Sequence, residues 1–336
     1  MPVAIRSANI ADLDPIAELL LADAKERCAA DPGLWRLSDD AQSKIYGTIK
    51  LAMEAEKAPF RQQWLVAEFG GRIVGVTHSI LLQVPPIYAG RFGPPGLIME
   101  GCFVSPDAPD GTHAELLNAA EADLIDAGAL ILLASSVVNG AWEPKYAGCG
   151  YAPLTAYYAK TGLNTQHDHS FVHSATETDV PGIVAASAVH RRILDDLHHV
   201  FWEPHKEADA RFGAWMTRSL TLSDRDMFVA HDDNRIRGYA ISQPATPTHF
   251  PTSHDISGIG VIDDFYHEAM ENTETLAPTA DEAKTLFSMA EVARTERGNH
   301  SVLVVCPANW SSKIKILEQS GYRNAIMWHI KIVKKD

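Results

Sequence analysis

Cysteine is scarce in this sequence of 336 residues. The four cysteines, Cys28, Cys102, Cys149 and Cys306, are widely spaced and form no Cys-x-x-Cys pair. A disulfide framework needs more cysteines at closer spacing. We therefore expect buried, reduced thiols in a cytoplasmic protein.

Long apolar segments are also missing. The longest uncharged apolar stretch, Ala127 to Val138, is far shorter than the roughly 20 residues of a membrane-spanning helix. The opening residues MPVAIRSANIADL lack the basic region and apolar block of a signal peptide. We expect neither a membrane partner nor a leader sequence.

Basic residues are outnumbered, with 29 Lys and Arg against 43 Asp and Glu and a net charge of −14. An acidic chain repels phosphate backbones, so we expect no nucleic-acid partner, whereas a cationic amine would be attracted.

Several motifs of common enzymes are absent. No Walker or dinucleotide-binding glycine pattern occurs, and Ser135-Ser136 lies in an apolar run without a nucleophile elbow. The histidines around His198 and His231 have no ligand spacing backed by cysteine or paired acids, so no metal is predicted. Hydrolase and nucleotide-binding functions therefore lack support.

An internal repeat is present instead. The length of the chain suggests two domains of ordinary size, and the repeat places them at 1–163 and 170–336. Three pairs of segments match in the same order at nearly constant offset: 5–16 with 172–183 (offset 167), 64–75 with 227–238 (163) and 150–151 with 321–322 (171).

Each copy alternates strand-like and helix-like stretches. In the first copy these include a short strand at 3–7, a hairpin at 64–82, a wholly apolar strand at 130–137 and a last strand at 151–160. The second copy repeats the order. This pattern predicts an α/β fold with a mixed sheet in each copy. The proline-rich loop 83–96 is either a plain hairpin extension or a lid over an acceptor site.

The stretch 97–117, LIMEGCFVSPDAPDGTHAELL, contains the most informative motif. An apolar strand from Leu97 to Val104 runs through a Pro/Asp/Gly loop into a helix, whose free amides are suited to phosphate. The stretch 97–117 resembles the core motif of the GNAT superfamily of acyl-CoA-dependent N-acyltransferases. Val104-Ser105-Pro106 matches the Val-x-Pro of that family. The central loop glycine falls on Gly111, with Ala108 and His113 where the family has Arg/Gln and Gly/Ala.

The resemblance implies two tandem GNAT-like folds and an acetyl-CoA or other short acyl-CoA cosubstrate. It places the pantetheine arm along the main chain of Cys102, Phe103 and Val104, in the gap where two parallel strands splay. The pyrophosphate would lie on the helix start, at Asp110, Gly111, Thr112, His113 and Ala114.

Glu100 is a candidate catalytic base. It is the only charged residue between Arg91 and Asp107, on a strand that otherwise looks buried, so its pKa should be raised. It also matches the place of an acid in several GNAT subgroups. The alternative is that its side chain points outward into solvent.

Tyr146 is a candidate acid. The spacing from Asn139 to Tyr146 and on to Gly150-Tyr151 resembles the family pattern in which a tyrosine protonates the coenzyme A thiolate. The alternative is a core aromatic residue.

The second copy departs from the pattern. Leu317 stands at the tyrosine position, and the stretch 264–279 has four acids and no glycine, so this copy is expected not to bind coenzyme A. Asp263-Asp264-Phe265 resembles an Asp-Asp-Phe signature of some GNAT-like domains, to which we assign no role. The alternative is that the two acids simply end a strand. The sequence thus predicts an N-acyltransferase acting on a small, possibly cationic amine; the alternative is an inactive binding or scaffold protein.

Overall fold

The computed structural model of the chain describes residues 2–55, 60–163, 171–232, 235–248 and 250–333. The strands are β1 (Ala4–Ser7), β2 (Gln62–Phe69), β3 (Arg72–Leu81), β4 (Gly96–Ile98), β5 (Phe103–Val104), β6 (Ile131–Val137), β7 (Ala152–Thr161), β8 (Val172–Ser174), β9 (Asp226–His231), β10 (Ile236–Pro244), β11 (Ile259–His267), β12 (Ser301–Pro307) and β13 (Arg323–Ile332).

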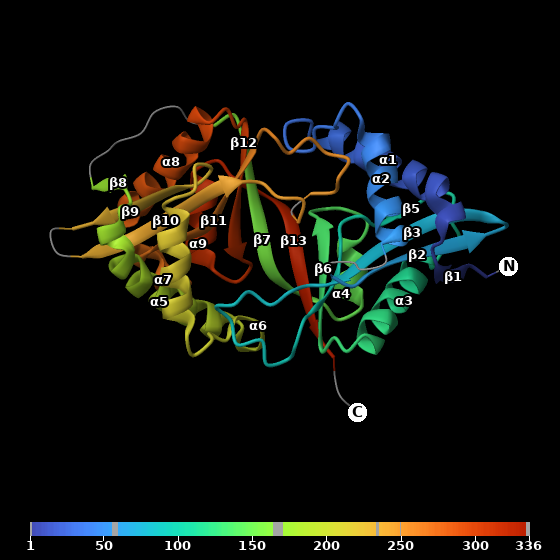
Figure 1. Cartoon of the computed structure of the whole chain (residues 1–336), viewed down its shortest axis with the longest axis horizontal. Coiled ribbons are helices and arrows are strands. Elements are labelled where there is room, and N and C mark those ends of the chain that lie inside the picture. Colours follow the sequence, from blue (N-terminus) through green and yellow to red (C-terminus); the bar gives the residue numbers. More distant parts are fainter. Residues whose placement is uncertain (1, 56–59, 164–170, 233–234, 249, 334–336) are drawn as a thin grey trace.

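The α-helices are α1 (Leu13–Ala30), α2 (Ala41–Glu54), α3 (Thr112–Asp126), α4 (Glu143–Gly148), α5 (Val180–Leu197), α6 (His199–Trp202), α7 (Ala208–Ser219), α8 (Ala280–Glu296) and α9 (Ser311–Gln319). In the first half, α1 and α2 lie on one side of the β2–β3 hairpin and α3 on the other (Figure 1).

The thirteen strands of the described residues form one sheet. Its order is β1-β2-β3-β4-β6-β13-β7-β12-β11-β10-β9-β8, with β5 paired to β3. Parallel pairs, β4 with β6 and β11 with β12, occur among antiparallel ones. The predicted mixed α/β class is confirmed, and both halves of the repeat contribute to the same sheet.

The closing strands of the two halves are exchanged. β13, the last strand of the chain, pairs with β6 of the first half, while β7 pairs with β12 of the second half. β7 and β13 also pair with each other at the centre of the sheet (Figure 1). The division into 1–163 and 170–336 stays a prediction about the repeat, and its joint at 164–170 lies outside the described residues.

Hydrophobic sequence explains the strands at the centre. β6 reads ILLASSV and six of its seven residues are buried, as expected for a strand covered on both faces. The largest buried cluster joins Leu133 and Tyr158 to Val304 and Ile330. The core therefore continues from one half into the other.

The predicted strand from Leu97 to Val104 is interrupted. β4 pairs with β6 only as far as Ile98, opposite Ala134, whereas Phe103 and Val104 of β5 pair with β3 alone. The chain between them, 99–102, leaves β6 and carries Glu100 and Gly101. The expectation of one continuous strand was wrong, and the expected splay between two parallel strands is found at this break.

Two loops cross between the halves in equivalent ways. Leu37 forms an antiparallel bridge with His254, and Tyr88 forms one with Pro204. Each bridge has a neighbouring main-chain bond, from Ser38 N to Ser253 O and from His205 N to Ile87 O, both 2.9 Å. Each half thus sends the loop that follows its hairpin onto the other half.

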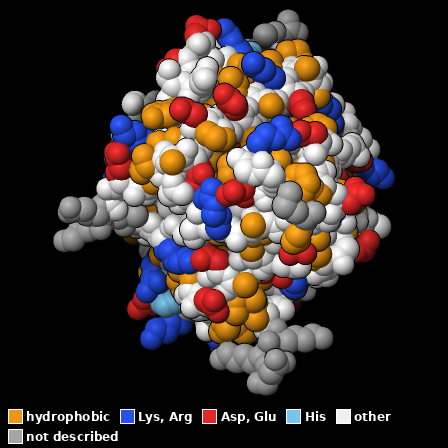
Figure 2. Space-filling view, turned by 90° about the vertical axis from the view of Figure 1, so that its right-hand side faces the viewer, with side chains coloured by type: hydrophobic (Ala, Val, Ile, Leu, Met, Phe, Trp, Pro, Cys, Tyr) orange, Lys and Arg blue, Asp and Glu red, His pale blue; other side chains and the backbone are white. Residues whose placement is uncertain are grey.

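The surface is mixed in charge. On the face shown in Figure 2, acidic and basic side chains alternate with scattered apolar ones, and no continuous basic area is visible there. No described helix combines the length and the apolar character needed to cross a bilayer.

Shortening Ile330 in β13 tests the shared core. Ile330 is buried, whereas Ile332 of the same strand is 41% exposed. Ile330→Ala should lower the free energy of unfolding by about 2–5 kcal/mol, and Ile332→Ala by less than about 1 kcal/mol. Urea unfolding followed by circular dichroism measures the loss.

Hydrogen exchange in the same variant tests the exchanged strands. Because β13 lies between β6 and β7, amides in β2–β3 and in β9–β10 should lose protection together in Ile330→Ala. Loss of protection in one half alone would contradict a single cooperative unit.

Candidate active site

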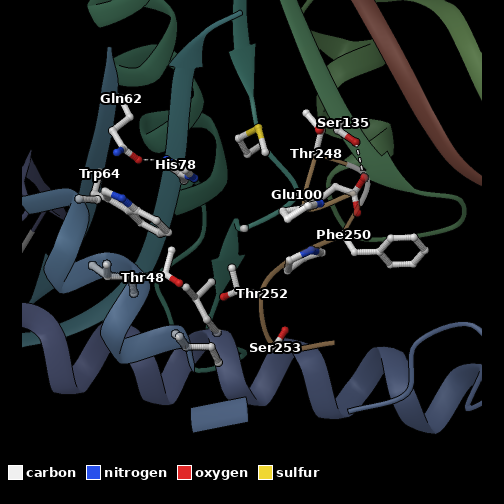
Figure 3. A pocket seen from close by; sticks show the side chains of 18 of the residues that line it. Thr48, Gln62, Trp64, His78, Glu100, Ser135, Thr248, Phe250, Thr252 and Ser253 are labelled. Carbon is white, nitrogen blue, oxygen red and sulfur yellow. Dashed lines mark hydrogen bonds between the residues drawn. The ribbon is translucent and has the colours of Figure 1, made fainter. Parts of the chain in front are cut away.

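A cavity of about 340 Å³ lies beside the break in the β4–β5 strand. Leu20 of α1 and Ile45 and Ile49 of α2 form its apolar side, and the β2–β3 hairpin contributes Trp64 and His78. Ser135 of β6 and Glu100 of the segment between β4 and β5 project into it (Figure 3). The cavity is therefore largely apolar and contains a carboxyl group.

Three hydrogen bonds hold Glu100 in place. Its Oε1 accepts from Ser135 Oγ at 2.6 Å, and its Oε2 accepts from the Arg27 guanidinium at 3.1 Å. Arg27 also donates to the main-chain oxygen of Glu100 at 2.8 Å. The residue is 8% exposed, so the alternative in which the side chain points into bulk solvent does not hold.

Burial raises the pKa of Glu100, and this outweighs the lowering by Arg27 and by the Ser135 hydrogen bond. Arg27 also pairs with Asp23 at 2.9 Å, and burial raises the pKa of Asp23 as well. One guanidinium therefore faces two carboxyl groups. Burial thus favours the protonated form of Glu100 more than for an exposed glutamate.

Two aromatic rings line the cavity beside Glu100. His78 stacks on Trp64 with ring centroids 4.0 Å apart and bonds Gln62 through Nε2 at 3.1 Å. Burial lowers the pKa of His78 to about 3, so its ring is neutral. Trp64 Nε1 is buried without a hydrogen-bond partner among the described residues. The wall attracts apolar groups and adds no charge.

The opposite wall comes from the second half. Phe250, Thr252 and Ser253 line the cavity from the loop after β10, with the ring of Phe250 directed away from the other lining side chains (Figure 3). No pattern in the sequence indicated that this loop would line the cavity. The lid considered for loop 83–96 lies elsewhere, because Pro85 to Tyr88 line a different cavity in the second half.

The predicted pyrophosphate cradle is only partly suitable. Gly111 precedes α3 with φ of 89°, a conformation that favours glycine, and Thr112 begins the helix. The Thr112 hydroxyl donates to Pro109 O at 2.7 Å. Asp107 and the exposed Asp110 add negative charge to this loop, and Arg72 is paired with Asp107 at 2.8 Å.

Trp142 occupies the splayed gap. Its indole Nε1 donates to Cys102 O at 3.1 Å, and its ring lies 4.9 Å from that of His113. Cys102 and Trp142 are buried, while Phe103, Val104 and His113 are half-buried and Ala114 is exposed. The main-chain oxygen expected to hold the pantetheine arm is therefore bonded to a side chain. A pantetheine arm along this strand would compete with the Trp142 indole N–H for Cys102 O.

Tyr146 lies behind Trp142. It is fully buried, and its ring centroid is 5.8 Å from that of Trp142 and 5.5 Å from that of Tyr151. Its hydroxyl has no hydrogen-bond partner among the described residues, and burial raises its pKa well above the usual value. The phenol holds its proton, and Tyr146 is not among the residues that line the cavity beside Glu100.

Asn139 lies at the turn after β6. It is exposed, adopts a φ of 62°, and its backbone N–H donates to Glu143 Oε2 at 2.7 Å. This position starts the segment that carries Trp142.

The second half closes its own gap in the same way. Lys313 Nζ donates to Phe265 O at 2.6 Å. Lys313 lies 171 residues after Trp142 and Phe265 lies 163 after Cys102, the offsets of the repeat. Leu317 is buried, as its place on α9 requires. The sequence could not indicate this agreement, because Trp142 and Lys313 are chemically different.

His254 allows a pH test of the wall from the second half. It is buried, its Nδ1 lies 3.1 Å from Trp35 O, and burial with Arg27 nearby lowers its pKa to about 4. In the unfolded chain the His254 ring takes up a proton near pH 6.5, whereas in the folded protein it does so only near pH 4. The free energy of unfolding therefore decreases as the pH falls from about 6.5 towards 4.

His254→Asn can still donate to Trp35 O but does not titrate. Both proteins should lose free energy of unfolding between pH 7 and pH 5. The loss should be about 1–2 kcal/mol smaller in His254→Asn than in the unaltered protein. Urea titrations at both pH values measure this. The same change at exposed His199 serves as the control, and parallel losses in all three proteins would contradict the assignment.

No protein-family model matches the sequence, and no curated protein sequence matches it. A solved structure of a GCN5-related N-acetyltransferase from Sphaerobacter thermophilus is similar over 99% of this chain and 96% of that one, with 14% identity and a TM-score of 0.58. A tandem GNAT protein from the clavulanic acid biosynthesis pathway covers 100% of both chains at 12% identity, with a TM-score of 0.48. The likeness to the Sphaerobacter thermophilus structure shows that the chain has the fold of the GNAT N-acetyltransferases.

Proposed function

We propose that this protein is an acyl-CoA-dependent N-acyltransferase whose chemistry takes place in the first half. The observation that carries the proposal is Glu100, a buried carboxyl group at the point where β4 leaves β6, facing a cavity large enough for a small molecule. Acyl-CoA, with acetyl-CoA as the expected form, would supply the acyl thioester when bound.

Glu100 would take the proton that an ammonium acceptor must lose before it can attack. Its raised pKa suits this role, because a base is most effective when its pKa lies near the working pH. Ser135 and Arg27 hold the carboxyl group toward the cavity. The apolar wall formed by Ile45, Ile49 and Trp64 favours a small amine with an apolar body.

The proposed cofactor residues are the main chain of Cys102 to Val104, the α3 start from Asp110 to Ala114, and Asn139. Trp142 would leave Cys102 O when the cofactor enters. Tyr146 holds a proton at its phenol and would face the thiolate only after Trp142 has moved.

A second candidate function is an inactive binding or scaffold protein. It is favoured by the bonds to Cys102 O and Phe265 O, which close the splayed gap in both halves. Coenzyme A binding separates the two functions.

Glu100→Gln tests the base. Turnover in a coenzyme-release assay across a panel of amines should fall about 100-fold or more, with the affinity for acetyl-CoA nearly unchanged. Ser135→Ala is the matched variant: it removes a hydrogen bond that lowers the Glu100 pKa, so the acidic limb of the rate profile should move to higher pH. A purely structural role for Glu100 would leave that limb in place.

Trp142→Ala tests the gap. Removing the indole frees Cys102 O and the space beside His113, so calorimetry should show coenzyme A binding about tenfold tighter than to the unaltered protein. Trp142→Phe loses the N–H and keeps most of the bulk, and should gain less. Absence of binding in all three proteins would favour the scaffold function.

A further inference from the structure

A second cavity, of about 760 Å³, lies in the second half between α5, α7, β11 and the loop from Pro85 to Tyr88. Leu194, Trp202 and Trp215 give it apolar and aromatic walls. The proposed transfer reaction makes no use of this cavity. A concave site of this size with a few polar groups is typical of a small-molecule site.

The loop from the first half gives the cavity a fixed wall and a hydrogen-bond donor. Ala89 N donates to Glu203 O at 2.7 Å, and Arg211 donates to Pro86 O at 2.8 Å. Tyr88 lines the cavity from this loop, and no described residue accepts a hydrogen bond from its hydroxyl. Burial raises the pKa of Tyr88, so the phenol keeps its proton and can donate to a ligand.

Asp264 of β11 lines the cavity, but its hydrogen bonds are already made. Its Oδ1 accepts from Tyr239 OH at 3.0 Å and lies 3.0 Å from His190 Nδ1. Burial raises its pKa, but the hydrogen bond with His190 and the nearby Lys313 outweigh burial and hold the pKa below the usual value. The negative charge of Asp264 is therefore compensated within the protein.

The neighbouring Asp263 also has partners within the protein. It accepts a hydrogen bond from Gln243 Nε2 at 3.1 Å. Burial and the charge of Asp264 raise its pKa to about 6, while the charge of Arg225 acts in the opposite direction. Neither acid of β11 therefore needs a cationic ligand.

The basic side chains that line the cavity outnumber the two acids: Arg191, Arg211, Arg218 and Lys313. Arg191 forms an ion pair with Asp209. Arg211 forms one with Glu207 at 2.7 Å. Lys313 stands beside the ionised carboxyl group of β11. Three of the four cations thus have an acidic neighbour.

Arg218 is the fourth cation. It is exposed to solvent, and its side chain has no ion-pair partner in the part of the chain that the structure describes. It lies on α7 three residues after Trp215, so the guanidinium and the indole stand on the same face of the helix. Among the described residues, the charges around the cavity are therefore paired except for one guanidinium beside an aromatic wall.

We infer that this cavity binds a small organic acid, with its carboxylate at Arg218 and its apolar body between Leu194, Trp202 and Trp215. A guanidinium offers a carboxylate two parallel N–H donors, and the hydroxyl of Tyr88 is a further donor. The aromatic walls would bury the body of the ligand. The inference does not depend on transferase activity in the first half.

Calorimetry on the full chain tests this with 3-phenylpropanoate, the neutral 3-phenylpropanol and the cation phenethylamine. The acid should bind about tenfold more tightly than the alcohol or the amine, because it alone pairs with Arg218. Arg218→Gln should weaken binding of the acid about tenfold and change that of the alcohol by less than about twofold. Arg192→Gln removes a charge from an exposed site on α5 outside the cavity, and should leave the affinity for the acid within about twofold.

Two further variants separate the outcomes. Ala214→Trp fills the cavity from an exposed helix position without changing charge, and should abolish binding of the acid. Glu100→Gln should retain binding at this site, so failure of the transferase proposal would not remove it. No binding of the acid, equal or tighter binding of the alcohol or the amine, or unchanged affinity for the acid in Arg218→Gln or Ala214→Trp would each overturn the inference.

Discussion

The divergence of β4 from β6 after Ile98 determines the chemistry available to this fold. Where two parallel strands separate, each exposes main-chain groups that must find other partners. Here Cys102 O bonds Trp142, and Glu100 is held by Ser135 across the opening. The same divergence in the second half leaves Phe265 O to Lys313. The candidate site and the obstacle to cofactor entry thus have one structural origin.

The repeat is preserved at the level of contacts more than at the level of residues. Trp142 and Lys313 are chemically different, yet each donates to the equivalent carbonyl. Glu100 and the pair Asp263 and Asp264 likewise place acids in the two cavities. Backbone geometry imposes the need for a donor, and the sequence of each half meets it with a different side chain.

Local features of the site could be predicted from sequence. An acid within an apolar run indicated a raised pKa at Glu100, and the Pro/Asp/Gly loop indicated the start of α3. The break after Ile98 was missed, although Glu100 and Gly101 interrupt the apolar run. The wall at Phe250 could not be predicted, because it depends on packing between residues about 200 positions apart, for which periodicity carries no information. The apolar pattern of β13 is likewise the same whether it lies beside β12 or β6.

The exchange of β7 and β13 has a consequence for synthesis of the chain. A growing polypeptide usually folds its leading domain first. Here β6 can pair with β13 only after residues 323–332 have left the ribosome. Until then, the first half carries an open strand edge lined by Ile131 to Val137, an exposed template for wrong pairing. A nascent chain stalled before residue 323 should therefore be a preferred client of chaperones that shield unpaired strands.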